Sequence, residues 1–271
     1  MGLSPFSSMT NFLLGADPEL FVVDGAGKFI ASIGKFGGTK ENPIPIGEGC
    51  AIQEDNVAVE FNIPPSDSED AFVAGLNFAL SEIEKKAKFH NLRLAIVPSA
   101  RFEQDQLESR AARVFGCEPD YNAWTGRVNP RPRTKDKALR SSGGHVHFGW
   151  TREKQYSPTI MVRGCDVLIG SALAQADPDE RRRLLYGKAG AFRNKPQYPG
   201  FEYRTPSNWW IGSEERMRWM YQQMTRVVTF LDEHPTHTFE EDAVLVDECI
   251  NKNNKEAFSV LNNKYDLEVP C

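Results

Sequence analysis

The residues of this chain that could do chemistry occur mainly as pairs separated by a single position. Four such pairs carry polar or ionisable side chains: Asp17 with Glu19, Glu60 with Asn62, His145 with His147, and Glu202 with Arg204. Side chains two positions apart point to the same face of a β-strand. If the four faces converge, they line a concave sheet, since charges inside a fold need partners or metals. Carboxylates with one imidazole suit Mg²⁺ or Mn²⁺ better than Zn²⁺.

Each pair taken alone also has a purely structural interpretation. The histidine pair, bracketed by glycines in residues 143–149, is as typical of a solvent-facing strand as of a ligand site. Pro18 cannot donate a ladder hydrogen bond, so its strand is predicted at a sheet edge or a bulge. There Asp17 and Glu19 either hold a hard cation or keep an edge strand charged. The recurrence of the pattern in four segments favours a site.

The sequence lacks the motifs of the common nucleotide-binding folds. The chain has no GxxxxGK[ST] motif and no GxGxxG that leads from a strand into a helix. A bound nucleotide therefore has to be held by metal ions and by cations of the later segments, which are Lys188, Arg193, Lys195 and Arg204. Charge neutralisation and positioning of this kind are sufficient for phosphoryl transfer.

The elements that position these residues can be predicted from periodicity. Strands are expected over residues 12–23, 51–63, 92–97, 143–149 and 201–208, and residues 186–196 are expected to form a glycine-containing loop. An amphipathic helix begins after the capping residues 66–70, and further helices cover residues 158–176 and the stretch from Ser213 to Leu231. The helices are predicted to cover the outer face of the sheet.

Composition places the chain among ordinary globular proteins. It has 271 residues, 40% hydrophobic content and a net charge of −5, so no global basic surface indicates nucleic acid. No segment is long and apolar enough to span a bilayer, the first residues lack a secretory pattern, and we expect a cytoplasmic protein. Five scattered cysteines without a CxxC pair argue against a disulfide framework and against structural zinc.

Two loops have a composition that fits either binding or packing. Residues 115–126, with Cys117, Tyr121 and Trp124, combine turn formers and aromatics. The cation-rich residues 127–140 are typical of a solvated loop, but next to the histidine pair they would also suit an anionic substrate.

Five motifs, taken in order, resemble the phage COOH-NH2 ligase (amidoligase) type 2 family of phiEco32-like phages, which is related to glutamine synthetase and glutamate-cysteine ligase. The motifs are Gly-Ala-Asp-Pro-Glu at 15–19, Asp-Asn-Val-Ala-Val-Glu-Phe-Asn at 55–62, Gly-Gly-His-Val-His-Phe-Gly at 143–149, Tyr-Gly-Lys-Ala-Gly-Ala-Phe-Arg at 186–193, and Glu-Tyr-Arg-Thr-Pro-Ser-Asn at 202–208. The resemblance implies an α+β, glutamine synthetase-like fold, in which a curved antiparallel sheet forms a funnel with helices outside. It implies one ligase domain over residues 1–271, with a core at about 13–231 and a C-terminal helical extension at 232–271.

The resemblance also implies the roles of individual residues. ATP and Mg²⁺, or Mn²⁺, would serve amide formation through an acyl phosphate. The metal ligands would be Asp17, Glu19, Glu60, His145 and Glu202, although Asp17 stands where the classical ligases have a longer glutamate. Glu60, Arg193 and Arg204 would be catalytic, with Arg204 on the transferring phosphoryl group. Lys188, Lys195 and His147 would join the two arginines at the nucleotide, unless His147 only supports His145.

Other functions fit the same residues. The funnel could transfer phosphate to a guanidinium or other nitrogen, a metal site could hydrolyse an amide without ATP, or a degenerate ligase fold could serve as a phage binding or virion protein. The ligase substrates stay open between amino acids, polyamines, peptide termini and a modified nucleotide base. No membrane partner is expected. The sequence leaves the oligomeric state open, and a homo-oligomer whose subunits share active sites is one of the alternatives.

Overall fold

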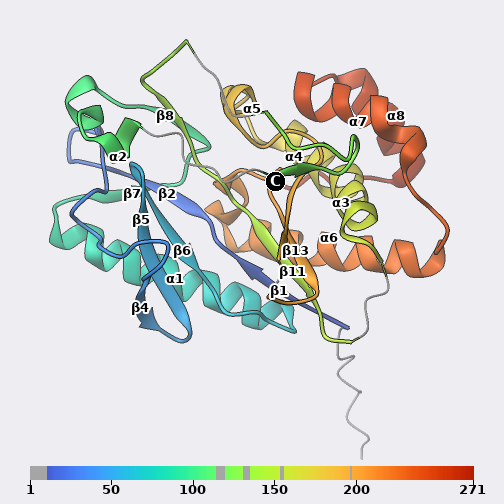
Figure 1. The fold of residues 1–271 in the computed structure, drawn as a ribbon, viewed down its shortest axis with the longest axis horizontal. Helices are drawn as coiled ribbons and strands as arrows, with labels where there is room; N and C mark the ends of the chain where they lie inside the picture. The colour runs from blue at the N-terminus through green and yellow to red at the C-terminus, as the bar shows by residue number, and fades with distance from the viewer. Residues whose placement is uncertain (1–10, 114–119, 131–134, 153–155, 196) are drawn as a thin grey trace, which may run out of the picture.

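The computed structural model describes residues 11–113, 120–130, 135–152, 156–195 and 197–271 (Figure 1). All strand pairs among them are antiparallel. The strands are β1 (Phe12–Ala16), β2 (Glu19–Val23), β3 (Phe29–Ile30), β4 (Ile44–Gly47), β5 (Cys50–Asp55), β6 (Ala58–Asn62), β7 (Arg93–Ala95), β8 (Ser99–Arg101), β9 (Tyr121–Asn122), β10 (Leu139–Ser141), β11 (Val146–Trp150), β12 (Ala191–Lys195) and β13 (Gly200–Tyr203). This confirms the predicted α+β class with antiparallel sheets.

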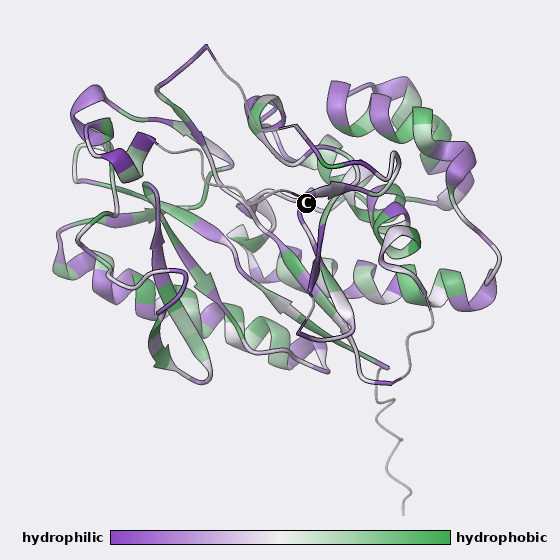
Figure 2. Ribbon diagram, viewed as in Figure 1, coloured by the Kyte–Doolittle hydropathy of each residue, from purple (hydrophilic) through white to green (hydrophobic). Residues whose placement is uncertain are grey.

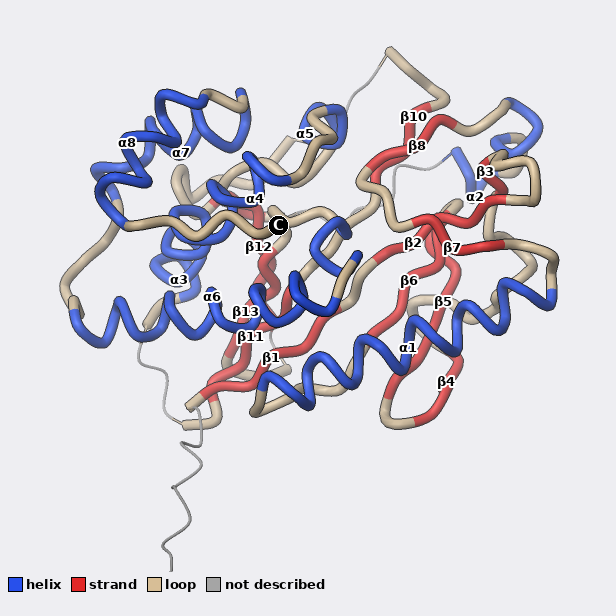
Figure 3. Tube along the Cα trace, turned by 180° about the vertical axis from the view of Figure 1, so that it is seen from behind, coloured by secondary structure: helices blue, strands red, loops and turns tan. Residues whose placement is uncertain are grey.

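The two longest helices lie across one side of the strands (Figure 3). The helices are α1 (Glu69–Phe89), α2 (Arg110–Arg113), α3 (Pro158–Cys165), α4 (Ser171–Ala176), α5 (Arg181–Leu185), α6 (Glu214–Glu233), α7 (Ala243–Val246) and α8 (Lys255–Tyr265). Seen from behind, α1 and α6 lie in front of the strands (Figure 3). Both are amphipathic, with purple and green alternating along them in Figure 2. None of the helices in the described ranges could cross a membrane.

Two sheets meet along the first strand segment. One has the order β1-β11-β13-β12-β9, and the other has the order β3-β2-β6-β5-β4. Residues 12–23 form β1 and β2, with a break at Asp17 and Pro18. The segment that contains β6 runs alongside this break, because Phe61 N donates to Pro18 O and Ile63 N donates to Ala16 O. Of the two predicted positions, a sheet edge or a bulge, the structure agrees with an irregularity within the sheet and not with an edge. The proline lies at an irregularity in the middle of the sheet, where only its carbonyl is needed.

The strands have one polar and one apolar face. Gly15, His147, Glu202 and Arg193 lie side by side in register on β1, β11, β13 and β12. Residues one position away form the opposite face, which is buried against the helices: Phe12, Leu14, Val146, Phe148, Trp150, Phe192, Phe201 and Tyr203. Burial of these large side chains fixes which face is turned toward the helices. The polar residues are thereby forced onto the other face.

Two segments differ from the sequence-based prediction. Residues 51–63 form the hairpin β5–β6 rather than one strand, with Asn56 in the left-handed region (φ 55°) at its turn. Asparagine tolerates this conformation, which makes a glycine-free tight turn feasible. Residues 186–196 were expected to be a loop, but residues 191–195 form β12. Arg193 and Lys195 consequently share one face of a strand that pairs with β13.

Candidate active site

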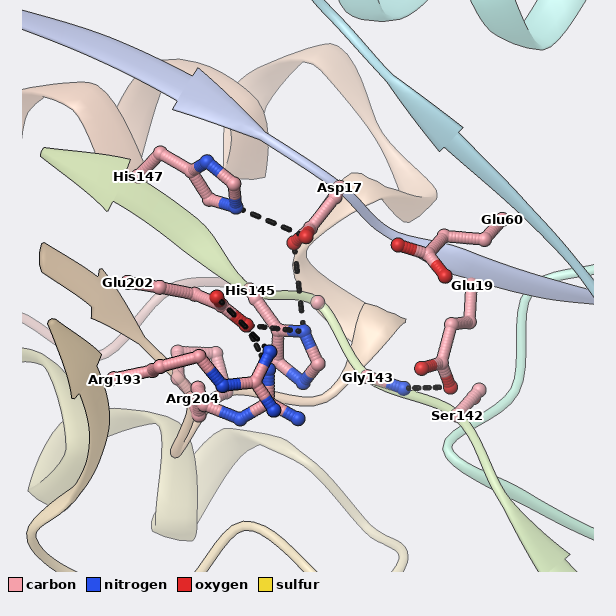
Figure 4. Close-up of polar contacts among 12 residues, drawn as sticks. Asp17, Glu19, Glu60, Ser142, Gly143, His145, His147, Arg193, Glu202 and Arg204 are labelled. Atoms are coloured by element: carbon pink, nitrogen blue, oxygen red, sulfur yellow. Dashed lines mark hydrogen bonds and ion pairs between the residues drawn. The ribbon is translucent and has the colours of Figure 1, made fainter. Parts of the chain in front are cut away.

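The first group of site residues is the histidine cluster, which consists of Asp17, His145, His147 and Glu202 (Figure 4). His147 Nε2 lies 2.9 Å from Asp17 Oδ2, and His145 Nδ1 lies 3.4 Å from Asp17 Oδ1 and 3.5 Å from Glu202 Oε1. Ligand atoms of Asp17, His147 and Glu202 all lie within 4.8 Å of one another. The cluster therefore contains three donors at the separation that one metal ion requires.

The second group is the acid cluster, which consists of Glu19, Asp55 and Glu60. Their carboxylate oxygens lie within 4.8 Å of one another. Glu19 is paired with Glu60 between β2 and β6, and its Oε2 accepts a hydrogen bond from Gly143 N at 2.8 Å. Gln53 Nε2 donates to Glu60 Oε2 at 3.0 Å. Asp17 and Glu19 thus belong to two different clusters of candidate ligands.

The acid cluster holds more negative charge than its surroundings compensate. Burial, together with repulsion from Asp55, raises the pKa of Glu19 from 4.5 to about 7. Burial and repulsion from Asp17 and Glu19 raise the pKa of Glu60 well above its ordinary value. Burial also raises the pKa of Asp55. Three carboxylates in this environment fit a hard divalent cation, which would supply the positive charge that the surrounding protein does not provide.

The histidine cluster has the protonation state that a metal site needs. Burial and the nearby Arg204 guanidinium lower the pKa of His145 to about 3, so its imidazole is neutral at physiological pH. Burial alone would raise the pKa of Asp17, but the neighbouring His147 and His145 lower it well below its ordinary value. Within the described residues, His145 Nε2 is buried and has no hydrogen-bond partner. A neutral imidazole, an ionised carboxylate and an unused ring nitrogen are suitable for a divalent ion.

Three cations surround the carboxylate of Glu202. Lys195 Nζ lies 2.5 Å and Arg193 NH1 3.5 Å from its Oε2, while Arg204 NH1 donates to its Oε1. Arg204 Nε also lies 3.6 Å from Asp120 Oδ2. The side chain of Glu202 is completely buried, and burial together with Asp17 raises its pKa. The two carboxylates, Glu202 and Asp120, carry less charge than the three cations, so this edge of the site is suited to an anion such as phosphate.

Some predicted residues lie elsewhere. Lys188 is exposed on the turn before β12, and its carbonyl accepts from Ala191 N and from Thr205 Oγ1. In the cation-rich segment, Arg140 is buried and donates to backbone carbonyls, Ala112 O among them, so it has a structural role. Trp124 donates from Nε1 to Asp166 and packs within the fold. Cys117, Arg131 and Arg133 lie outside the described residues.

Three residues, the half-buried Asp55 and the buried Asp166 and Arg182, were missed by sequence reasoning. Asp55 was hidden because the hydrophobic alternation runs on through the hairpin turn, although the Asp-Asn dipeptide is a turn signal. Asp166, completely buried, accepts hydrogen bonds from Trp124 Nε1, Gly190 N and Tyr203 OH. Arg182 is 2% exposed, and nothing in the Arg-rich segment distinguishes it from its solvated neighbours.

Comparison with known proteins gives a match for the segment that contains the two histidines, Glu202 and the three cations around it. Residues 138–253 match the family of phage phiEco32-like COOH.NH2 ligase-type 2 proteins. The resemblance expected from the motifs is confirmed over this segment. The match includes His145, His147, Arg193, Glu202 and Arg204 but not the motifs of β1, β2 and the β5–β6 hairpin. The acid cluster is therefore supported as a candidate site only by the geometry described above.

Solved structures give distant likenesses. The structure of GmaS without ligand matches with a TM-score of 0.44 and 12% identity over 93% of this chain and 65% of that one. A bifunctional glutathione synthetase from Pasteurella multocida matches with a TM-score of 0.48 and 13% identity over 94% of this chain and 46% of that one. The chain thus spans less than two thirds of either protein. A search of curated proteins gave no match.

Proposed function

We propose that this chain is an ATP- and divalent metal-dependent ligase that joins a carboxylate to an amine through an acyl phosphate. The observation that carries the proposal is the placement of two metal-ligand clusters beside three cations on one polar face. Asp17 belongs to one cluster and Glu19 to the other, on the strand segment that runs through both. A site with two metal positions and an anion-binding edge suits phosphoryl transfer from ATP.

The residues have distinct tasks in this proposal. Glu19, Asp55 and Glu60 would hold one divalent ion, and Asp17, His145, His147 and Glu202 would hold another. Bound there, Mg²⁺ or Mn²⁺ would neutralise phosphate oxygens and polarise the phosphorus centre. Arg193 and Lys195 would bind the nucleotide phosphates, and Arg204 would neutralise the γ-phosphoryl group as it is transferred.

The chemistry proceeds in two displacements. The substrate carboxylate attacks the γ-phosphorus of ATP, the bond to the β-phosphate oxygen breaks, and ADP leaves. The amine then attacks the acyl carbon, phosphate leaves, and the nitrogen loses its proton to give the amide. The substrates are small-molecule or peptide carboxylates and amines, and a modified base remains within this class. Water must be excluded in between, because it would hydrolyse the acyl phosphate.

The test uses hydroxylamine as a general amine. Purified protein is incubated with Mg²⁺, ATP and pools of carboxylates, and hydroxamate is measured together with ADP. We expect hydroxamate only with one pool, in a 1:1 ratio to ADP, and a loss of at least 100-fold in Glu60→Gln and Arg204→Ala. Glu84→Gln and Arg127→Ala, at exposed positions outside the site, are the matched controls and should retain activity.

The outcome separates the alternative functions. ADP formation with a nitrogen acceptor but without hydroxamate indicates a phosphotransferase on nitrogen. Amide cleavage without ATP indicates a metal-dependent hydrolase. If calorimetry detects no binding of Mg²⁺·ATP, the proposal is refuted, and a catalytically degenerate binding or virion protein takes its place.

A further inference from the structure

Tyr186 lies against Arg204, at the positively charged edge of the site, and has no role in the proposal above. Its ring is 5.1 Å from the guanidinium carbon of Arg204 and 5.6 Å from that of Arg182. The ring centroid of His145 lies 5.7 Å away. Cation–π contacts with two guanidinium groups hold the ring in place and create a positive potential around it.

The ring rests on a rigid support. The guanidinium group of Arg182 donates from Nε to Ser142 O, from NH1 to Thr205 O and from NH2 to Pro206 O, each at 2.7 Å. These carbonyls flank the strands that carry His145 and Arg204. Tyr186 N also donates to Arg182 O at 2.7 Å. The position of the tyrosine relative to the site strands is therefore fixed by several hydrogen bonds.

The hydroxyl group of Tyr186 is the unexplained feature. It is buried, and it has no hydrogen-bond partner in the described parts of the chain. Three other tyrosine hydroxyl groups do have partners, since Tyr156 donates to Asp232, Tyr203 to Asp166 and Tyr265 to Asp242. A buried hydroxyl group that is left unpaired destabilises the fold. A group kept at that cost beside Arg204 is suited to a ligand that binds there.

We propose that the Tyr186 hydroxyl donates a hydrogen bond to an oxygen of the γ-phosphoryl group of ATP. This rests on the proposed function, because it places the γ-phosphoryl group beside Arg204. The two guanidinium groups against the ring repel a metal ion and attract an anionic oxygen. The hydroxyl keeps its proton throughout, so the contact orients and neutralises the group without changing the balance of the reaction.

The experiment compares Tyr186→Phe with the wild-type protein in two measurements. Without ligand, the thermal midpoint should be unchanged or higher, because phenylalanine removes a buried unpaired hydroxyl and keeps the ring. In calorimetry with Mg²⁺, affinity for the non-hydrolysable β,γ-imido analogue of ATP should fall about 10-fold, while affinity for ADP is unchanged. Tyr121→Phe, at an exposed tyrosine on β9, is the matched control and should alter neither affinity.

Each other result is decisive. A lower thermal midpoint shows that the hydroxyl has a structural partner and overturns the inference. Equal loss of affinity for ADP and the analogue, or no loss at all, overturns it as well. If the wild-type protein binds neither nucleotide, the proposed function itself fails, which is a different outcome from a normal wild type with an unaffected variant.

Discussion

Replacement of Glu19 by glutamine should stabilise the metal-free protein at alkaline pH. Glutamine has nearly the same shape and can still accept the hydrogen bond from Gly143 N, but it carries no charge. Glu19 in the folded chain has a pKa of about 7 because of burial and repulsion from Asp55, against 4.5 ordinarily. Its ionisation in the acid cluster is therefore unfavourable, and glutamine removes that cost.

The sign and size of the effect follow from proton linkage. Between pH 4.5 and 7 the unfolded chain has lost this proton while the folded chain retains it, so stability falls as pH rises through this window. A pKa difference of this size corresponds to about 3 kcal/mol above pH 7. Glu19→Gln should therefore exceed the wild type by about 2–3 kcal/mol at pH 8 and match it near pH 4.

The assay is urea denaturation of both proteins at several pH values, with and without Mg²⁺. Saturating Mg²⁺ should raise the stability of the wild type at pH 8 and raise that of Glu19→Gln much less, because a neutral amide is a poorer ligand. A stability difference that does not change with pH, or an equal gain of both proteins with Mg²⁺, would refute the reasoning.

Glu54→Gln, on β5 next to Asp55, is the control of opposite sign. Burial alone would raise the pKa of Glu54, but backbone N–H groups of residues 34–37 donate to its carboxylate and lower it. Its ionised form stabilises the fold above the unfolded pKa, and this contribution is lost as pH falls through the folded pKa. The glutamine variant should be less stable than the wild type at pH 8, by an amount that shrinks in acid.

Three further predictions concern positions around the site. Gly200→Ala should lower the free energy of unfolding by about 1–3 kcal/mol in urea denaturation, because the added Cβ would lie 2.0 Å from Phe148 O; an unchanged value would contradict this packing. Asp166→Asn should lower the free energy of unfolding by about 3 kcal/mol at pH 8, because an amide cannot accept from all the donors around the carboxylate. A variant as stable as the wild type in urea denaturation would contradict this prediction. Lys195→Ala should weaken the binding of Mg²⁺·ATP about 10-fold in calorimetry, because Lys195 contacts Glu202 in the site. Lys188→Ala, at an exposed position, should leave the affinity unchanged, and equal effects of the two substitutions would contradict the prediction.

The faces of the strands could be predicted from sequence because side-chain alternation is a local property. His145 and His147 both contact Asp17, and Glu202 and Arg204 contact each other, so each pair points to one side as the period of two requires. The register between strands could not be predicted in this way. The row that joins His147, Glu202 and Arg193 depends on which strands pair and on the burial of the opposite, apolar face.

Residues that support the site from below gave no signal in the sequence. Arg182 lies among arginines whose pattern predicts a solvated helix face. It is nevertheless buried, and its guanidinium group donates to three backbone carbonyls. Asp166 follows an apolar helix in a π-helical turn, and its donors come from segments 42, 24 and 37 residues away, at Trp124, Gly190 and Tyr203. Such contacts exist only after the chain has folded, so periodicity and composition cannot reveal them.

The separation of Asp17 from Glu19 explains why one strand can serve two clusters. Residues two apart on an extended chain are displaced by roughly 6.6 Å along the strand. Oxygen ligands of one Mg²⁺ or Ca²⁺ lie within about 2.6 Å of the ion, so neighbouring carboxylates at that displacement reach different ions more easily than the same one. The observed grouping, Asp17 with His147 and Glu202, and Glu19 with Asp55 and Glu60, has this arrangement. A substitution at Asp17 should therefore disturb the histidine cluster first, and one at Glu19 the acid cluster first, which metal titrations of the two variants can distinguish.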